Sequence, residues 1–112
     1  MVAAPEVPQR GDVFLIALDP TLGREIKKTR PCVVVSPDEL NTHLSTFVVA
    51  PLTTGGFKYP FRVSCRFQKQ DGHIVLDQIR AIDRRRLVKR LGRVSSRTLE
   101  KVLLVLQEMF AS

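Results

Sequence analysis

The residue types best suited to chemistry on a phosphate group gather in two predicted loops. The first loop, residues 19–30, includes Glu25 with the cations Lys27, Lys28 and Arg30, and the second, residues 53–59, opens with Thr53, Thr54, Gly55 and Gly56. An arginine guanidinium is planar, permanently charged and able to donate two parallel hydrogen bonds to a phosphate. A fixed cation and a hydroxyl aimed at developing charge each lower a barrier by about 2–4 kcal/mol.

Taken one at a time, these residues favour simpler interpretations. Arg30 before Pro31 suits a surface ion pair at the start of a strand, and the run Thr53–Gly56 suits an ordinary turn. Residue types alone therefore do not decide whether the two loops form a site.

RNA is a substrate on which such a limited set of groups can act. Its 2′-hydroxyl attacks the adjacent phosphate, so a protein need only align the sugar, stabilise the added charge and manage two protons. The sequence has no Walker A loop, no HExxH, no GxSxG and no plausible Ser-His-Asp set. Any catalysis must therefore depend on arginine, lysine, threonine and one carboxylate.

The composition indicates one globular domain over residues 1–112, with residues 1–9 expected to be flexible. The chain is 44% hydrophobic and 26% charged, which is ordinary for a globular protein. No apolar run approaches the roughly 20 residues of a membrane helix. The N-terminus lacks the basic start and apolar stretch of a signal peptide. These features predict a cytoplasmic protein without a membrane partner.

We expect neither a metal nor a cofactor. Cys32 and Cys65 form no CxxC pair, and His43 and His73 are isolated in turn-like sequence. A zinc site requires about four ligands at a recognisable spacing. The cysteines are predicted to be small buried hydrophobic residues, and the histidines to be surface residues.

The charge predicts a polyanionic or acidic partner. The net charge is +7, and the segment from Arg80 to Lys101 holds nine basic residues and two acidic ones. Basic segments of this kind bind nucleic acid or acidic protein tails, although many are only solvated faces. The charge alone leaves nucleic acid, an acidic tail and both of them open.

Short strands followed by one late helix predict a small, mostly β barrel with helical additions. Strands are expected at residues 11–18, 31–36, 46–52, 61–65 and 92–94, with helical turns at 37–41 and 83–87. Residues 73–76 and 78–82 are expected to form two further short strands or one bent strand. Ser95 or Ser96 is expected to cap a final helix, whose apolar stripe includes Leu99, Val102, Leu103, Leu106 and Phe110. Part of this stripe is wide enough for a dimer interface.

Six motifs in order resemble the MazF/PemK toxins. These are RGDVFLIALDP (Arg10–Pro20), Gly23–Glu25, TRPCVVVSPDELN (Thr29–Asn41), APLTT (Ala50–Thr54), KYPFRV (Lys58–Val63) and LDQIRAID (Leu76–Asp83). The resemblance implies an α+β, mostly β fold, an SH3-like small barrel of the CcdB/PemK type with short helical insertions and a C-terminal α-helix. It also implies a homodimer that cuts single-stranded RNA at a short motif, without ribosome or metal.

The same resemblance implies roles for individual residues. The arginine before the proline of the second strand acts in catalysis, which here is Arg30, and the threonine at the end of the third strand holds the scissile phosphate, which here is Thr53. We expect Arg30 to stabilise charge and to protonate the leaving oxygen, and Glu25 to orient Arg30 or to accept a proton. Lys27, Lys28, Asn41, Thr54, Gln78 and Arg80 are expected to line the RNA groove.

The family resemblance further implies an acidic antitoxin, similar to MazE, whose partly disordered tail covers the RNA groove. A net charge of +7 suits such a tail. The chain departs from the family pattern at Ile26–Thr29, where many members have glutamine and small residues, so the cleavage motif cannot be transferred.

Two alternatives remain open at the level of sequence. One is a toxin of the same fold that poisons DNA gyrase, although that branch uses a C-terminal tryptophan and this chain has none. The other is a non-catalytic RNA-binding module that kept the barrel.

Overall fold

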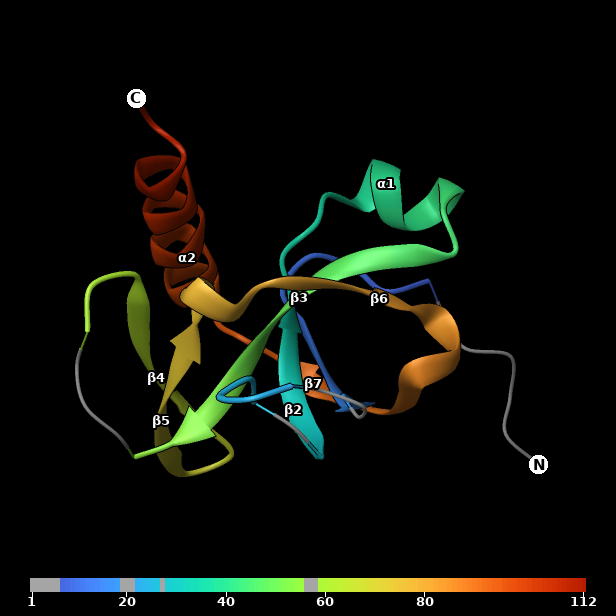
Figure 1. Ribbon diagram of the computed structural model, residues 1–112, viewed down its shortest axis with the longest axis horizontal. Helices are drawn as coiled ribbons and strands as arrows, with labels where there is room; N and C mark the ends of the chain where they lie inside the picture. The colour runs from blue at the N-terminus through green and yellow to red at the C-terminus, as the bar shows by residue number, and fades with distance from the viewer. Residues whose placement is uncertain (1–6, 19–21, 27, 56–58) are drawn as a thin grey trace.

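The computed structural model describes residues 7–18, 22–26, 28–55 and 59–112. In these ranges the sheet has seven strands: β1 (Asp12–Ala17), β2 (Thr29–Val34), β3 (Thr46–Thr54), β4 (Arg62–Phe67), β5 (Gln70–Val75), β6 (Arg80–Asp83) and β7 (Leu87–Arg93). The helices are α1 (Asp38–His43) and α2 (Ser96–Met109), with 3-10 turns η1 (Leu76–Gln78) and η2 (Arg84–Arg86). Figure 1 shows α2 standing at one end of the sheet, beside the β4–β5 hairpin.

Strand β3 is the centre of the sheet, because three other strands pair with it. All of its pairings are antiparallel: β2 pairs along one edge, while β6 and β5 pair one after the other along the opposite edge. The β6 pairing ends at Val49↔Arg80 and the β5 pairing begins at Leu52↔Ile74. Pro51 is one of the two β3 residues between these pairings. Because proline has no backbone N–H to donate, it suits a position where β3 has no paired strand on this side.

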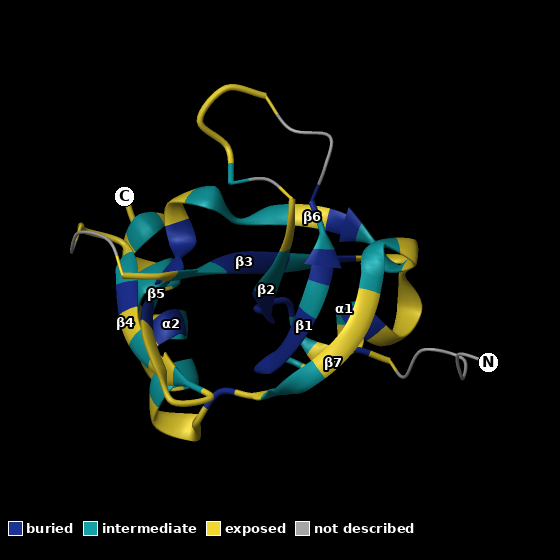
Figure 2. Ribbon diagram, turned by 90° about the horizontal axis from the view of Figure 1, so that it is seen from below, coloured by how far each residue is buried: buried dark blue, intermediate teal, exposed yellow. Residues whose placement is uncertain are grey.

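The central strands are buried on both faces, which explains their nearly continuous apolar sequences. One core cluster lies against α2 and the β4–β5 hairpin and includes Val13, Val33, Ala50, Ile74 and Val102. The second cluster, on the other face of β1–β3, includes Phe14, Ile16, Cys32, Val34 and Phe47. Successive strand residues point to opposite faces, so adjacent residues such as Cys32 and Val33 belong to different cores. The dark buried segments in Figure 2 follow these strands.

Helix α2 covers the first core with one side only. Val102 is fully buried, and Leu99, Leu106 and Met109 pack against the same cluster. Leu104 and Phe110 remain 60% and 73% exposed. In the described residues, no helix is both long and apolar enough to cross a membrane.

The predicted fold class is confirmed: the protein is mostly β with a barrel-like, strongly curved sheet and a C-terminal helix. The sheet order β4-β5-β3-β2-β1-β7 leaves β4 and β7 as edges in the described residues, so the barrel is not closed.

Several expected boundaries were wrong. Arg30 belongs to β2, and Thr53 and Thr54 belong to β3, because pairing with β1 and β5 extends both strands into the expected loops. Strand β7 spans Leu87–Arg93 and not residues 92–94, because its basic residues hide the strand pattern while its pairing with β1 holds it. Residues 1–6 of the expected flexible lead-in lie outside the described residues. In the rest of it Pro8 is buried, and the Gln9 amide donates to the Asp12 carboxylate at 2.9 Å.

Much of the basic segment has a structural role. Arg90 and Arg93 both bind the buried carboxylate of Asp12, at 3.2 and 3.0 Å, and so fasten β7 to the start of β1. Arg84 donates to the carbonyl of Asn41 at 2.7 Å, and Arg86 donates to the carbonyl of Ala17 at 3.1 Å. These arginines therefore hold neighbouring segments in place in addition to making the surface basic.

Ser95, not Ser96, caps α2, since its Oγ accepts a hydrogen bond from the Thr98 amide at 3.1 Å. We expect Ser95→Ala to lower the free energy of unfolding by about 1 kcal/mol because that amide loses its partner. The matched variant Ser96→Ala, in the first turn of the same helix, should change it little. Urea unfolding of both variants tests the prediction, and equal losses would contradict it.

Candidate functional site

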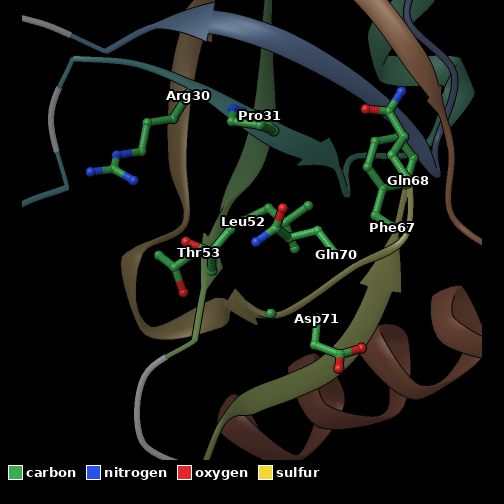
Figure 3. Close-up of a pocket in the computed structure, with 10 residues that line it drawn as sticks. Arg30, Pro31, Leu52, Thr53, Phe67, Gln68, Gln70 and Asp71 are labelled. Carbon is green, nitrogen blue, oxygen red and sulfur yellow. The ribbon is translucent and has the colours of Figure 1, made fainter.

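Arg30 and Thr53 line one pocket, at the start of β2 and the end of β3. The β2–β3 register runs Val34↔Val49, Val33↔Ala50 and Cys32↔Pro51. Continued by two residues, this register places Arg30 opposite Thr53. The pocket has a volume of about 200 Å³, and Pro31, Leu52 and Thr54 share its lining with them. In Figure 3, the Arg30 guanidinium and the Thr53 side chain lie on the same side of this pocket.

Strand β5 fixes the position of Thr53. A Cβ at Gly72 would lie 2.0 Å from the Thr53 carbonyl oxygen, so only glycine allows the two backbones to approach this closely. The Thr53 hydroxyl lies 3.5 Å from the His73 carbonyl, and the His73 ring Nδ1 lies 2.9 Å from the Gly55 carbonyl. The Gly55 amide also donates to the Asp71 carbonyl at 3.4 Å. The segment Asp71–His73 therefore holds the end of β3 from one side.

His73 was expected to be a surface residue in turn-like sequence, whereas the structure places it, half-buried, in strand β5. It pairs with Thr53 in the β3–β5 register and binds the first residue after β3. A carbonyl oxygen can only accept, so Nδ1 is the donor and carries a proton in this arrangement. The sequence around His73 gives no sign of this role, because the partner strand lies 20 residues away.

A second pocket, of about 220 Å³, contains Glu25, Gln78 and Arg80. Pro51 also lines it, and Pro51 and Thr53 are two residues apart on β3, so their side chains share a face. We call these the Arg30–Thr53 pocket and the Glu25–Gln78 pocket. They are neighbours, because Thr53 lines the first and Pro51 lines the second on the same face of β3.

The predicted residues of the Glu25–Gln78 pocket hold the β1–β2 loop. The Gln78 Oε1 accepts from the Ile26 amide at 2.7 Å, and Arg80 donates to the Leu18 carbonyl at 3.2 Å. The Glu25 carboxylate accepts from the Leu22 amide within the loop at 2.7 Å. These contacts hold Leu18, Leu22 and Ile26, which belong to the described part of the chain before Arg30.

Asp77 brings a negative charge to the same pocket. Its carboxylate accepts two hydrogen bonds from the Arg62 guanidinium, at 3.0 and 3.1 Å. The side-chain hydrogen bond from Arg62 lowers the pKa of Asp77 below its ordinary value. Asp77 therefore stays ionised at neutral pH, paired with a cation at the rim of the pocket.

The expectation that Asn41 lines the RNA groove was wrong. Asn41 is fully buried, its Oδ1 accepts from the Ser36 hydroxyl at 2.6 Å, and its Nδ2 donates to the Ser36 carbonyl at 3.1 Å. It fastens α1 to the sheet. Thr54 and Lys28 are exposed, as groove residues must be, whereas Lys27 lies outside the described residues.

Arg30 and Arg80, from the two pockets, both act on the thiol of Cys32. Cys32 is buried, and burial raises the pKa of its thiol to about 12, while the charges of Arg80 and Arg30 act in the opposite direction. Both guanidinium groups thus act electrostatically on the same buried atom. This result fits the prediction that Cys32 is a small hydrophobic residue and has no reactive thiolate.

Sequence reasoning missed the wall opposite Arg30. Phe67, Gln68, Gln70 and Asp71, from the hairpin between β4 and β5, line the Arg30–Thr53 pocket. In the sequence they form only a polar turn. Only the pairing of β5 with β3 brings this hairpin to Thr53.

Comparisons with known proteins agree with this geometry. Residues 9–110 match the family described as PemK-like, MazF-like toxin of type II toxin-antitoxin system. The chain belongs to this family. The endoribonuclease toxin MazF of Escherichia coli K12 is 38% identical over 76 residues, or 68% of each chain. The endoribonuclease MazF of Staphylococcus epidermidis is 37% identical over 89 residues, or 74% of each chain.

Solved structures of MazF proteins have the same fold. MazF from Deinococcus radiodurans superposes with a TM-score of 0.83 at 26% identity, covering 94% of this chain and 97% of its own. A mycobacterial endoribonuclease in complex with its cognate antitoxin superposes with a TM-score of 0.76 at 25% identity, covering 90% of this chain and 92% of its own.

The contact between His73 and Gly55 predicts how two variants of this toxin differ. His73→Leu removes the donor, whereas His73→Asn has nearly the same branched shape and keeps a nitrogen donor close to the Nδ1 position. We expect the Gly55 amide to exchange its hydrogen about fivefold faster in His73→Leu, which corresponds to a hydrogen bond of about 1 kcal/mol. His73→Asn should stay near the wild-type rate. Equal exchange in both variants, measured by NMR, would show that the ring does not hold this segment.

Proposed function

We propose that this toxin cuts single-stranded RNA at a short motif, leaving a 2′,3′-cyclic phosphate and a 5′-hydroxyl, without a metal ion. Membership of a family whose curated relatives are named endoribonucleases supports the activity itself. The observation that carries the proposed chemistry is the shared pocket of Arg30 and Thr53, a permanent cation and a hydroxyl on adjacent strands.

In this mechanism the 2′-hydroxyl of the substrate is the nucleophile. Its oxygen bonds to phosphorus, the bond from phosphorus to the 5′-oxygen breaks, and the 2′-hydroxyl proton leaves to water. Arg30 neutralises the charge that builds up on the phosphate and supplies a proton to the departing 5′-oxygen. The Thr53 hydroxyl donates a hydrogen bond to a phosphate oxygen. Preorganised donors of this kind act strongly, because they need not reorient during the reaction.

Glu25 serves as a positioning residue in this account. Its carboxylate accepts from the Leu22 amide and lines the neighbouring pocket. Together with Gln78, which binds the Ile26 amide, it shapes the loop that precedes Arg30. Of its two expected roles, orientation of Arg30 is thus favoured over proton transfer.

The RNA backbone follows the β3 face that the two pockets share. Thr54, at the end of β3, also lines the Arg30–Thr53 pocket, while Gln78 and Arg80 line the Glu25–Gln78 pocket. The exposed Lys28 adds positive charge next to Arg30 in the chain, and Lys27, which lies outside the described residues, remains an expected RNA contact. A basic path of this kind binds phosphates and makes affinity depend on salt.

The partners follow from charge and from the family. We propose a homodimer in the cytoplasm, with the exposed Leu104 of α2 and Phe110 directly after this helix as apolar surface available for an interface. We further propose an acidic, MazE-like antitoxin that covers the RNA groove. The net charge of +7 supports it, as does the antitoxin complex of the similar mycobacterial endoribonuclease.

Replacing Arg30 tests the proposed chemistry. Arg30→Ala should lower the rate of RNA cleavage in EDTA by about 10²–10³-fold, because one preorganised donor is lost. Arg30→Lys should restore only part of it, since a lysine cannot donate two parallel hydrogen bonds. The control is Arg66→Ala, which removes an exposed arginine on β4 whose carboxylate partner lies 4.0 Å away.

The product ends complete this test. Discrete cuts with 5′-hydroxyl ends, lost in Arg30→Ala and kept in Arg66→Ala, are the predicted result. Full cleavage by a folded Arg30→Ala variant would refute the role of Arg30. Binding of RNA without any cleavage by the wild type would favour a non-catalytic module.

A further inference from the structure

The β4–β5 hairpin forms half of the Arg30–Thr53 pocket, yet the chemistry proposed above uses none of its side chains. Phe67, Gln68, Gln70 and Asp71 line the pocket, and β4 and β5 pair without interruption as far as Phe67↔Gln70. In Figure 3, the Gln70 side chain extends into the space between Phe67 and the Arg30–Thr53 side of the pocket.

The tip of this hairpin has an unusual backbone for its residue types. Gln68 and Lys69 have φ angles of 50° and 65°, in the left-handed region. Two-residue hairpin turns of this kind favour Asn-Gly or Asp-Gly, because larger side chains are disfavoured there. Left-handed conformations of non-glycine residues gather at ligand sites, where the surroundings enforce them.

Contacts outside the turn hold it in place. The Gln68 Nε2 donates to the Leu91 carbonyl of β7 at 3.1 Å. The Phe67 ring packs over Gly92, where an added Cβ would lie 3.2 Å from the ring. Gln68 and Phe67 therefore fix the wall to β7, in addition to its pairing with β5.

The lining of the pocket suits one planar, neutral, polar ring. Pro31, Leu52 and Phe67 supply apolar surface, and Gln70 supplies a donor and an acceptor on one planar amide. The volume of about 200 Å³ is below the roughly 300 Å³ at which pockets for drug-sized ligands begin, so it suits one base and no second one. Single-stranded RNA is commonly read through such splayed bases, which stack on aromatic side chains and present their edges to amides.

We propose that this pocket holds the nucleobase next to the scissile phosphate and that Gln70 reads the edge of this base. The inference rests on the proposed function, in which that phosphate lies between Arg30 and Thr53.

The test is the cleavage motif of each variant on a randomised single-stranded RNA library, read by sequencing the new 5′-hydroxyl ends. The variants are Gln70→Leu, which removes the polar atoms, and Gln70→Glu, which turns the donor into an acceptor. Lys69→Gln, at the tip of the same hairpin but outside the pocket lining, is the matched control. All are compared with wild-type toxin freed of antitoxin and with Arg30→Ala.

We expect Gln70→Leu to relax the base preference at one position beside the cut, by between about fivefold and a hundredfold, the range for one bidentate contact. Gln70→Glu should shift the preference at that position toward bases that present an amino or imino donor. The other positions of the motif, and the whole motif of Lys69→Gln, should be unchanged.

An unchanged motif in both Gln70 variants would overturn the inference. If these variants instead weakened only inhibition by the antitoxin, the pocket would be part of the antitoxin surface, and the inference would again fail. Failure of the proposed function would give a different result. In that case Arg30→Ala would still cut RNA, and this outcome does not depend on the cleavage motifs of the Gln70 variants.

Discussion

Along one side of strand β3, the paired strand changes from β6 to β5 within two residues, and the arrangement of the site depends on this change. Its pairing with β6 ends at Val49, and its pairing with β5 begins at Leu52. Across from Ala50 and Pro51, the chain between β5 and β6 forms the turn η1, which carries Gln78 out of the sheet. Gln78 can then reach the Ile26 amide and hold the β1–β2 loop. Beyond Pro51, β5 holds Thr53 in place through Gly72 and His73.

Backbone pairing thus prepares a site whose side chains are mostly exposed or half-buried. Arg30 and Thr53 need no network of buried charges, because the neighbouring strands β2 and β3 carry them into one pocket. Arg80 adds its charge near Arg30 while it secures the Leu18 carbonyl. A surface of this kind can stabilise a phosphate without the desolvation cost that a buried arginine would carry.

The sequence was sufficient to predict the elements whose signals are local. The apolar run at residues 11–18 predicted β1, and the spacing of Leu99, Val102 and Leu106 predicted α2. The prediction that Arg30 and Thr53 act at the same site came from resemblance to the family and not from periodicity. Asn41 was misassigned because a polar residue in a short helix gives no sign that its amide is buried against Ser36. His73, Gln70 and the length of β7 depend on partners distant in sequence, which no local pattern contains.

The central claim is that Arg30 and Thr53 act on the same phosphate. A double-mutant cycle in single-turnover cleavage of one RNA tests it most directly, with Arg30→Ala, Thr53→Val and the double variant, each shown to be folded. Groups that stabilise one transition state are not independent, so we predict that the double variant loses much less activity than the product of the two single losses. Losses that multiply in full would contradict the account, because they would mean that the two side chains act at separate places.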